Sequence, residues 1–594
     1  MFRMSRRRFV VAATGPAVAA LVVGGFLVAQ GATASGTVAV TVDASSLLGT
    51  VPSSANGVNT AVFDGHLNDA SAATALAGAG VDALRYPGGS TSDVYHWQTN
   101  STVSGQSYAN PSNGFDDFMG IASKVGAAPI ITVNYGSGTA AEAGAWVKYA
   151  NVTKGYGVKY WELGNEVYGD GTYGTSWEYN TKSKGATAYA DNIASYVAQM
   201  KAADSSIKVG AVLTTYGNWP DGKVATNYGD SADWNQTVLQ KDGANVDFVI
   251  LHYYPTSTTE AGMLAQYQNI ANIVKQTRTE INEYAGSNAA NIKIMITETD
   301  ANYELDSAPS ALFAADTYMT FLENGVASVD WWDLHNGAAT VSSDADGTTD
   351  FGDEGLLSNG SCSGGACEPA EDTLFPTYYG LKAVGDFATS GGAMVAATSS
   401  DSAVTAYAVK QPSGSLNVML VNHSASTSEP VSLAYSGFAP SSVTSAEQFA
   451  AGTKKLTTLG GVSTSALTLP AYSITVLKLG APGVSGGSST ACAVTATKTA
   501  DSGSTFSQSL TIKNTGTSAV TGWKLGFAFS GNQRIASGTN ATYHQSGAAV
   551  LAHPVSGDTT IAAGASVTIG YTATYTGSNT APTWYALNGV RCTL

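Results

Sequence analysis

A regular alternation of short apolar runs with segments of helical periodicity constrains the fold of this chain more than any other feature. The intervening segments repeat apolar residues at helical spacing, as in Ala186–Ala203 and Glu260–Glu283. Eight strands that alternate with helices predict an α/β fold with a closed (β/α)8 barrel. An open, doubly wound sheet is the alternative, but no glycine-rich phosphate loop follows the first run. The predicted strands are Ala55–Thr60, Asp82–Pro87, Pro129–Tyr135, Lys159–Glu166, Ile207–Leu213, Asp247–Tyr254, Ile292–Glu298 and Val329–Leu334.

The first 34 residues are expected to be an export signal. Four arginines precede the apolar run Phe9–Val28, and Ala32-Thr33-Ala34 follows as an A-x-A cleavage site. Ser5–Val10 fits a twin-arginine signal, with Sec export as the other route and an uncleaved anchor as the alternative reading. No later stretch has enough consecutive apolar residues to span a bilayer. We therefore expect a secreted, extracellular protein with no membrane contact after signal cleavage.

Composition narrows the class of partner. Hydrophobic residues make up 44% of the 594 residues and charged residues 12%, so the chain can bury large cores. Loss of the signal removes four arginines and no acidic residue, which lowers the formal net charge from −16 to −20. A surface of this sign repels nucleic acid and anionic membranes. The sequence thus excludes nucleic acid as a partner.

The four cysteines form two natural pairs. Cys362 and Cys367 lie in a loop rich in serine and glycine, while Cys492 and Cys592 bracket the last hundred residues. In an exported chain both pairs predict disulfides. There is no C-x-x-C pair and no neighbouring histidine cluster, so we expect neither a metal site nor a cofactor.

Shifts in periodicity mark the domains. A lead strand in residues 35–54 is expected to join a β-sandwich at 389–479, where runs of period two replace the helical spacing. The barrel occupies 55–388, the signal 1–34, and a Gly/Ser-rich linker 480–491. Residues 492–594 are all-β by pattern and form a separate domain.

Two glutamates stand at the C-terminal ends of the fourth and seventh predicted strands. Glu166 follows Asn165, and Glu298 ends an apolar run. Because these strand ends share one rim of a closed barrel, the two carboxyl groups can converge. Two carboxyl groups that flank a glycosidic bond suit glycoside hydrolysis, with retention at about 5–5.5 Å and inversion at about 6.5–9.5 Å. An ordinary salt bridge is the alternative role for either glutamate alone.

Asn165-Glu166 on strand four followed by Glu298 on strand seven resembles clan A of the glycoside hydrolases. The resemblance covers about residues 55–388, with a β-sandwich behind the barrel as in families 51, 39 and 30. It implies a retaining enzyme in which Glu166 is the acid/base and Glu298 the nucleophile. It also implies that Asn165 hydrogen-bonds the sugar 2-hydroxyl.

Further residues are expected to support this pair. Arg85 lies in an Arg-Tyr-Pro-Gly-Gly motif that resembles that of family 51 α-L-arabinofuranosidases, and it is expected to orient Glu298. His252 ends the sixth predicted strand, where clan A often places a residue that touches the nucleophile, and Tyr254 follows it. Glu162 is expected to point into the barrel as a support residue.

Tyr135 and Trp332 are candidates to stack on a sugar ring, since an aromatic face suits the C–H face of a pyranose or furanose. Rim packing is the alternative for both residues. The segment around the expected nucleophile reads Thr297-Glu298-Thr299, where family 51 usually has Asp-Glu-Trp. The two-glutamate mechanism does not depend on that difference, but the sugar specificity does.

Residues 492–594 resemble a family 2 carbohydrate-binding module. The matching features are the bracketing cysteines, the Ile-Lys-Asn-Thr-Gly run from Ile512, Gly522-Trp523 and the Leu-Asn-Gly run from Leu587. Cellulose-binding members present a flat row of exposed tryptophans, and Thr539 holds one of those positions here. Trp523 is expected in the core, which leaves Trp584 as the candidate aromatic contact with polysaccharide.

These observations predict a secreted retaining glycosidase of the α-L-arabinofuranosidase type. The expected substrates are plant polysaccharides: arabinoxylan, arabinan, xyloglucan or a cellulose-associated glycan. An endo-β-glycanase or a β-xylosidase of the same clan is the alternative enzyme. A non-catalytic polysaccharide-binding protein is the alternative from another class, and the presence of both glutamates argues against it.

Overall fold

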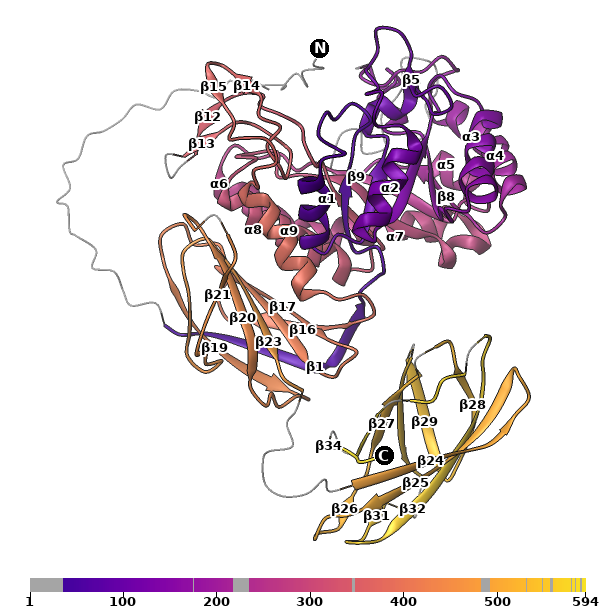
Figure 1. Cartoon of the computed structure of the whole chain (residues 1–594), viewed down its shortest axis with the longest axis vertical. Helices are drawn as coiled ribbons and strands as arrows, with labels where there is room; N and C mark the ends of the chain where they lie inside the picture. Colours follow the sequence, from indigo (N-terminus) through magenta and orange to yellow (C-terminus); the bar gives the residue numbers. More distant parts are fainter. Residues whose placement is uncertain are drawn as a thin grey trace, which may run out of the picture. The chain divides into compact units, whose positions relative to one another are not determined.

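The computed structural model describes residues 36–594 except 175, 217–233, 345–347, 454, 482–491, 530, 547, 556–558, 578, 583 and 588–589. The predicted export signal and most of the predicted linker lie outside the described residues. The chain forms two compact units (Figure 1). The first runs to Pro412 and takes in Asn417–Gly437 and Ser445–Lys478, and the second is mainly Leu479–Leu594.

Eight parallel strands close into a barrel in chain order, which confirms the predicted fold class. The last strand pairs with the first, with Val329 opposite Asn56 and Trp331 opposite Val58. Each strand lies within or one residue beyond its predicted range. The barrel strands are β2 (Asn56–Asn59), β3 (Ala83–Tyr86), β6 (Ala128–Val133), β7 (Tyr160–Leu163), β8 (Lys208–Val212), β9 (Phe248–Tyr253), β10 (Lys293–Thr299) and β11 (Val329–Trp331).

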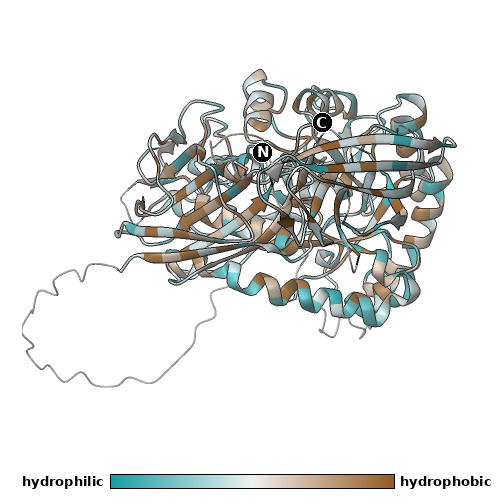
Figure 2. Cartoon of the chain, turned by 90° about the horizontal axis from the view of Figure 1, so that it is seen from below, coloured by the Kyte–Doolittle hydropathy of each residue, from teal (hydrophilic) through white to brown (hydrophobic). Residues whose placement is uncertain are grey.

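A helix follows every barrel strand, and the helices surround the strands (Figure 1). The barrel strands are buried along most of their length, while the helices in Figure 2 mix hydrophobic and hydrophilic residues. This difference is expected for strands that are buried on both faces and helices that have one solvent-exposed face. The helices are α1 (Ala70–Gly78), α2 (Phe115–Val125), α3 (Ala140–Val147), α4 (Ala186–Ala203), α5 (Trp234–Asp242), α6 (Glu260–Leu264), α7 (Ile270–Tyr284), α8 (Ala308–Glu323) and α9 (Pro376–Phe387).

The prediction of one helix over Glu260–Glu283 was wrong in one respect. A 3-10 segment, Ala265–Asn269, separates α6 from α7. None of its residues is fully buried, and Tyr267 packs only partly buried against the core. The other predicted helix, Ala186–Ala203, has the bounds of α4.

Behind the barrel, the β-sandwich is built on nine strands in the order β21-β20-β23-β18-β17-β16-β1-β19-β22. The N-terminal strand β1 precedes the barrel in sequence but lies between β16 and β19, which both follow it. It pairs antiparallel with β16 and parallel with β19. The strands are β1 (Val38–Thr50), β16 (Ala393–Ser399), β17 (Val404–Lys410), β18 (Leu416–Asn422), β19 (Glu429–Ser436), β20 (Val443–Ala450), β21 (Thr457–Thr458), β22 (Leu467–Leu469) and β23 (Ser473–Leu479).

Helix α8 joins the sandwich to the barrel. Its buried Asp316 accepts hydrogen bonds from Thr405 and Tyr407 of β17 at 2.6 and 2.8 Å, and its other oxygen lies 2.6 Å from His423 Nε2. Charge-assisted bonds to one buried carboxylate hold the two layers in register. Barrel and sandwich residues accordingly share one hydrophobic core.

The second unit has a core of its own, with Trp523 fully buried at its centre as predicted. A four-stranded sheet has the order β24-β25-β32-β28 and a five-stranded sheet β29-β30-β27-β33-β34, and β26 (Val520–Thr521) pairs with β31 (Thr560–Ile561). The strands are β24 (Cys492–Asp501), β25 (Thr505–Asn514), β32 (Ser566–Thr574), β28 (Arg534–Thr539), β29 (Ala541–Ser546), β30 (Ala549–Pro554), β27 (Leu525–Ala528), β33 (Tyr585–Leu587) and β34 (Val590–Arg591).

Both predicted disulfides are present. Cys492–Cys592 joins the ends of the second unit, with an S–S distance of 2.07 Å. Cys362–Cys367 closes a small hairpin of β14 (Cys362–Ser363) and β15 (Ala366–Cys367), in the segment that follows the last barrel strand. Within the described ranges, no helix is both long and apolar enough to cross a membrane.

The position of β1 leads to a stability prediction. Val40 is fully buried and pairs with Ser399 on one side and Leu433 on the other, whereas the next side chain, Thr41, is exposed. Val40→Asp buries a charge without a partner and should lower the free energy of unfolding by about 3 kcal/mol or more. Thr41→Asp should change it by less than about 0.5 kcal/mol. Equal shifts of the two variants in thermal unfolding would contradict this account of β1.

Candidate active site

The segment after β7 places Asn165 and Glu166 at the C-terminal rim of the barrel. The predicted strand extends to Glu166, but β7 ends at Leu163 and Gly164 turns the chain with φ 80°. A Cβ at Gly164 would lie 2.6 Å from Val167 and 2.8 Å from Tyr135, so only glycine suits this turn. Glu166 is thus presented by a tight turn, not by the strand, and is 7% exposed.

Glu298, in β10, lies opposite Glu166 across the rim and is 2% exposed. His252 of β9 bridges the two glutamates, with Nδ1 3.1 Å from Glu166 Oε1 and 3.3 Å from Glu298 Oε2. One carboxylate oxygen of each glutamate and the histidine nitrogen all lie within 4.8 Å of one another. An oxygen of each carboxyl group therefore lies close to the other, which is compatible with the about 5–5.5 Å between the carboxyl groups of a retaining enzyme.

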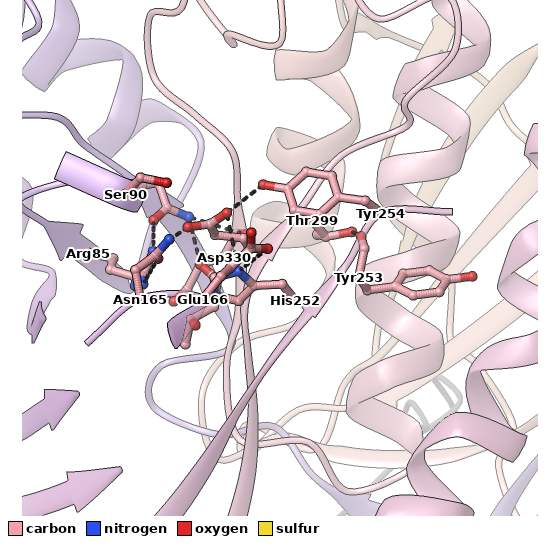
Figure 3. Close-up of polar contacts among 12 residues, drawn as sticks. Arg85, Ser90, Asn165, Glu166, His252, Tyr253, Tyr254, Thr299 and Asp330 are labelled. Carbon is pink, nitrogen blue, oxygen red and sulfur yellow. Dashed lines mark hydrogen bonds and ion pairs between the residues drawn. The ribbon is translucent and has the colours of Figure 1, made fainter. Parts of the chain in front are cut away.

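Arg85 of β3 contacts four side chains from different elements, and Figure 3 shows it beside one of them, Asn165. Its Nε donates to Glu162 Oε2 at 2.6 Å, and its Nη1 donates to Glu298 Oε1 at 2.8 Å. The same Nη1 reaches Asn59 Oδ1, and Nη2 reaches Asn165 Oδ1, both at 2.9 Å. The guanidinium thus aligns the expected nucleophile with the asparagine that precedes Glu166.

Charge explains why a buried arginine is stable here. Burial alone would lower the pKa of Arg85, but the carboxylates of Glu162 and Glu298 raise it above its ordinary value. Glu162 points into the barrel, as expected, and is completely buried. Its Oε2 also accepts from Thr132 at 2.7 Å, so it is fixed on two sides.

Two further donors fix the carboxyl groups. Tyr254 donates its hydroxyl to Glu298 Oε2 at 2.7 Å, and Trp177 donates Nε1–H to Glu166 Oε2 at 2.7 Å. Figure 3 shows the Tyr254 hydroxyl directed at the cluster and the ring of Tyr253 directed away from it. Tyr254 was expected from the sequence, whereas Trp177 was not.

The expectation that Tyr135 stacks on a sugar was wrong. The residue is 1% exposed, and its ring contacts Tyr189 and Tyr196 of α4 at centroid distances of 5.0 and 5.8 Å. The packing of α4 therefore covers its faces. Trp332 follows β11 and is half-buried, and a Cβ at Gly89 would lie 2.6 Å from its ring. The glycine admits this indole beside the segment that follows Arg85.

Glu178 is the main residue of the site that the sequence analysis missed. Its Oε1 accepts from Asn165 Nδ2 at 2.8 Å and from Ser90 Oγ at 2.7 Å, and it is 4% exposed. Asp93, also missed, accepts the backbone N–H of Asn165 at 3.1 Å. The available signal was Trp177-Glu178, an aromatic–acid pair soon after Asn165-Glu166.

Burial raises the pKa of several carboxyl groups around the site. The pKa of Glu178 lies well above its ordinary value because of burial, reinforced by the charges of Asp93 and Glu166. Burial also raises the pKa of Asp93 to about 6 and that of Asp330, below the rim, to about 7. Glu178 therefore favours its neutral form at neutral pH, whereas the raised pKa values of Asp93 and Asp330 let these two groups change protonation near neutral pH.

Comparisons with known proteins agree with this architecture. A family model described as "Cellulose binding domain" matches residues 492–592. Exoglucanase A of Cellulomonas fimi is 48% identical over 89 residues, which are 15% of this chain and 10% of that protein. Alpha-L-arabinofuranosidase C of Emericella nidulans is 31% identical over 154 residues, covering 22% of this chain and 29% of that protein. The matched stretches thus span less than a third of either relative.

The crystal structure of an α-L-arabinofuranosidase from Thermotoga maritima is similar to this chain with a TM-score of 0.57. The alignment covers 74% of this chain and 99% of that one, at 18% sequence identity. At this identity the likeness establishes the fold, a barrel with an associated sandwich.

The raised pKa values lead to a pH prediction. A carboxyl group whose folded pKa exceeds its unfolded value of about 4 stabilises the fold fully below that value and loses this contribution as the pH rises through the folded pKa. Burial gives Asp330 a folded pKa of about 7, so the unfolding free energy should fall between about pH 5 and pH 8.

Asp330→Asn should flatten this fall, as measured by melting temperature against pH, because the group that loses its proton is gone. Asp401→Asn is the control, since Asp401 is exposed. A melting temperature that rises from pH 5 to pH 8 would contradict the assignment.

Proposed function

We propose that this protein is a secreted retaining glycoside hydrolase of the α-L-arabinofuranosidase type that acts on plant cell-wall polysaccharide. The observation that carries the proposal is the pair Glu166 and Glu298, buried on the barrel rim with oxygens within 4.8 Å of each other. That spacing suits direct attack by one carboxylate on the sugar while the other transfers a proton.

In the first step Glu166 gives its proton to the glycosidic oxygen as Glu298 attacks the anomeric carbon. The bond to the leaving group breaks, and a covalent ester forms between the sugar and Glu298. In the second step the ionised Glu166 takes a proton from water, which attacks the same carbon. The ester breaks, Glu298 is released as a carboxylate, and Glu166 is again protonated.

The hydrogen bonds support this division of roles. Glu298 accepts from the cationic Arg85 and from Tyr254, two donors that hold its carboxyl group in the orientation that a nucleophile requires. Glu166 accepts from the neutral Trp177 and lies near the buried carboxyl of Glu178, surroundings that suit a proton donor. His252 Nδ1 contacts both glutamates. Its N–H can therefore donate a hydrogen bond to whichever glutamate carries the negative charge at each step.

The substrate class rests on similarity together with the site. The relative from Emericella nidulans and the fold of the Thermotoga maritima enzyme support an arabinofuranosyl substrate. Asn165, held by Arg85 and Glu178, is positioned to bind the 2-hydroxyl next to the reacting carbon. Trp332 is the aromatic side chain proposed to contact the sugar.

The second unit is proposed to bind polysaccharide, with cellulose as the first candidate because of the match to the cellulose-binding domain family. Trp584 is half-buried, so only part of its ring is available for a ligand. Thr539 is exposed at the end of β28. The module therefore offers less aromatic surface than a row of tryptophans.

Substitution of the two glutamates tests the mechanism. Glu298→Gly should reduce kcat/KM on an aryl arabinofuranoside by more than about 10⁴-fold, with partial rescue by azide at the anomeric carbon. Glu166→Ala should cost about 10²–10⁴-fold for a poor leaving group and far less for an activated one, because the lost step is protonation of the leaving oxygen. An undiminished rate in Glu298→Gly would overturn the nucleophile assignment.

A panel of aryl glycosides tests the substrate. We expect turnover of the α-L-arabinofuranoside, with proton NMR showing retention at the anomeric carbon. Preferential turnover of a β-xyloside, or of polymeric β-glucan without any aryl glycoside, would favour the xylosidase or endo-glycanase alternative. Binding to polysaccharide with no hydrolysis would favour the non-catalytic alternative.

Two substitutions in the second unit test its role. Trp584→Ala should reduce retention of the full-length protein on insoluble cellulose, because it removes aromatic contact area. Thr539→Trp should increase retention, since it adds an exposed indole. Neither change should alter kcat/KM on a soluble aryl glycoside, and unchanged retention in both variants would contradict this placement of the ligand.

A further inference from the structure

The two glutamates and His252 also have the composition of a metal site. We infer that Glu166, His252 and Glu298 bind a zinc ion in the absence of substrate, and that zinc and substrate exclude each other. The three residues are 7%, 5% and 2% exposed, and each offers one ligand atom within 4.8 Å of the other two. An ordinary cluster of acidic residues on a protein surface differs from this set because it is exposed and contains no nitrogen ligand.

The spacing of the ligand atoms fits zinc. Zinc binds histidine nitrogen and carboxylate oxygen at about 2.0–2.2 Å in tetrahedral geometry, which places neighbouring ligand atoms about 3.3–3.6 Å apart. His252 Nδ1 lies 3.1 Å from Glu166 Oε1 and 3.3 Å from Glu298 Oε2. The two glutamate oxygens lie within 4.8 Å of each other, so an ion that replaces the Nδ1 proton has an oxygen ligand on each side.

Outer contacts turn the ligand oxygens toward the histidine. Arg85 holds Glu298 Oε1 at 2.8 Å, which leaves Oε2 on the His252 side. Trp177 holds Glu166 Oε2 at 2.7 Å, which leaves Oε1 on the same side. Such outer-shell partners orient ligands and contribute to metal affinity. The catalytic arrangement therefore also preorganises a three-ligand set.

Three protein ligands leave the fourth zinc position for water, as in open zinc sites. This position lies between the carboxyl groups that, by the proposed function, face the anomeric carbon. A zinc ion there binds the same two carboxylates that would stabilise the positive charge on the reacting sugar. The exclusion of substrate therefore rests on the proposed function, whereas zinc binding itself does not.

The other buried histidine between two carboxyl groups lacks this geometry. His335 contacts Asp64 through Nδ1 at 2.9 Å and Asp372 through Nε2 at 3.1 Å. The two ring nitrogens point in opposite directions, so these carboxyl groups cannot share one ion with the same nitrogen. The rim site differs from this one because both of its glutamates contact the same histidine nitrogen.

Calorimetric titration of the chelator-treated full-length protein with zinc chloride tests the inference. We expect one zinc equivalent, with His252→Asn weakening the affinity at least about tenfold. The double variant His544→Asn, His553→Asn is the control, because those histidines stack at 5.0 Å in the second unit. Circular dichroism should confirm that each variant is folded. Absence of zinc binding, or equal affinity in His252→Asn, would overturn the site.

Kinetics separates this inference from the proposed function. Zinc should raise KM for the aryl arabinofuranoside without changing kcat, and a chelator should restore the original KM. A fall in kcat at unchanged KM would refute mutual exclusion. If no glycoside is hydrolysed, the proposed function fails, and calorimetry still decides whether zinc binds.

Discussion

The buried guanidinium of Arg85 is the interaction on which the site depends. It joins Asn59 of β2, Glu162 of β7, Asn165 in the following turn and Glu298 of β10. A buried charge that loses its partner costs several kcal/mol, so each of these elements is tied to the others through one cation. The arginine therefore determines where the two expected catalytic segments lie relative to each other.

This arrangement also divides the carboxyl groups into two classes. Glu162 and Glu298 share the charge of Arg85, whereas burial raises the pKa of Glu178, Asp93 and Asp330. The raised pKa of Glu178 favours its neutral form, which limits its repulsion of Glu166. One oxygen of Glu166 and one of Glu298 face His252. This geometry suits both proton transfer and a bound cation.

Local patterns predicted much of this site. Apolar periodicity placed Arg85, His252 and Glu298 at strand ends, where a barrel collects functional residues. The sequence did not indicate Glu178 because it lies in an irregular segment, and its contacts with Asn165 and Ser90 form only in the folded chain. Tyr135 was misjudged because its neighbours on α4 lie more than fifty residues away in sequence, and no pattern near Tyr135 reveals that they cover its ring.

By itself, the sequence determined the eight strands, the two glutamates at or just beyond strand ends, the cysteine pairs and the separate C-terminal domain. These follow from periodicity and spacing, which are local properties of a chain. Only the tertiary structure decided that an oxygen of Glu166 lies within 4.8 Å of one of Glu298, and that His252 touches both. Distances across a barrel depend on strand number, tilt and stagger at closure, which no single segment encodes.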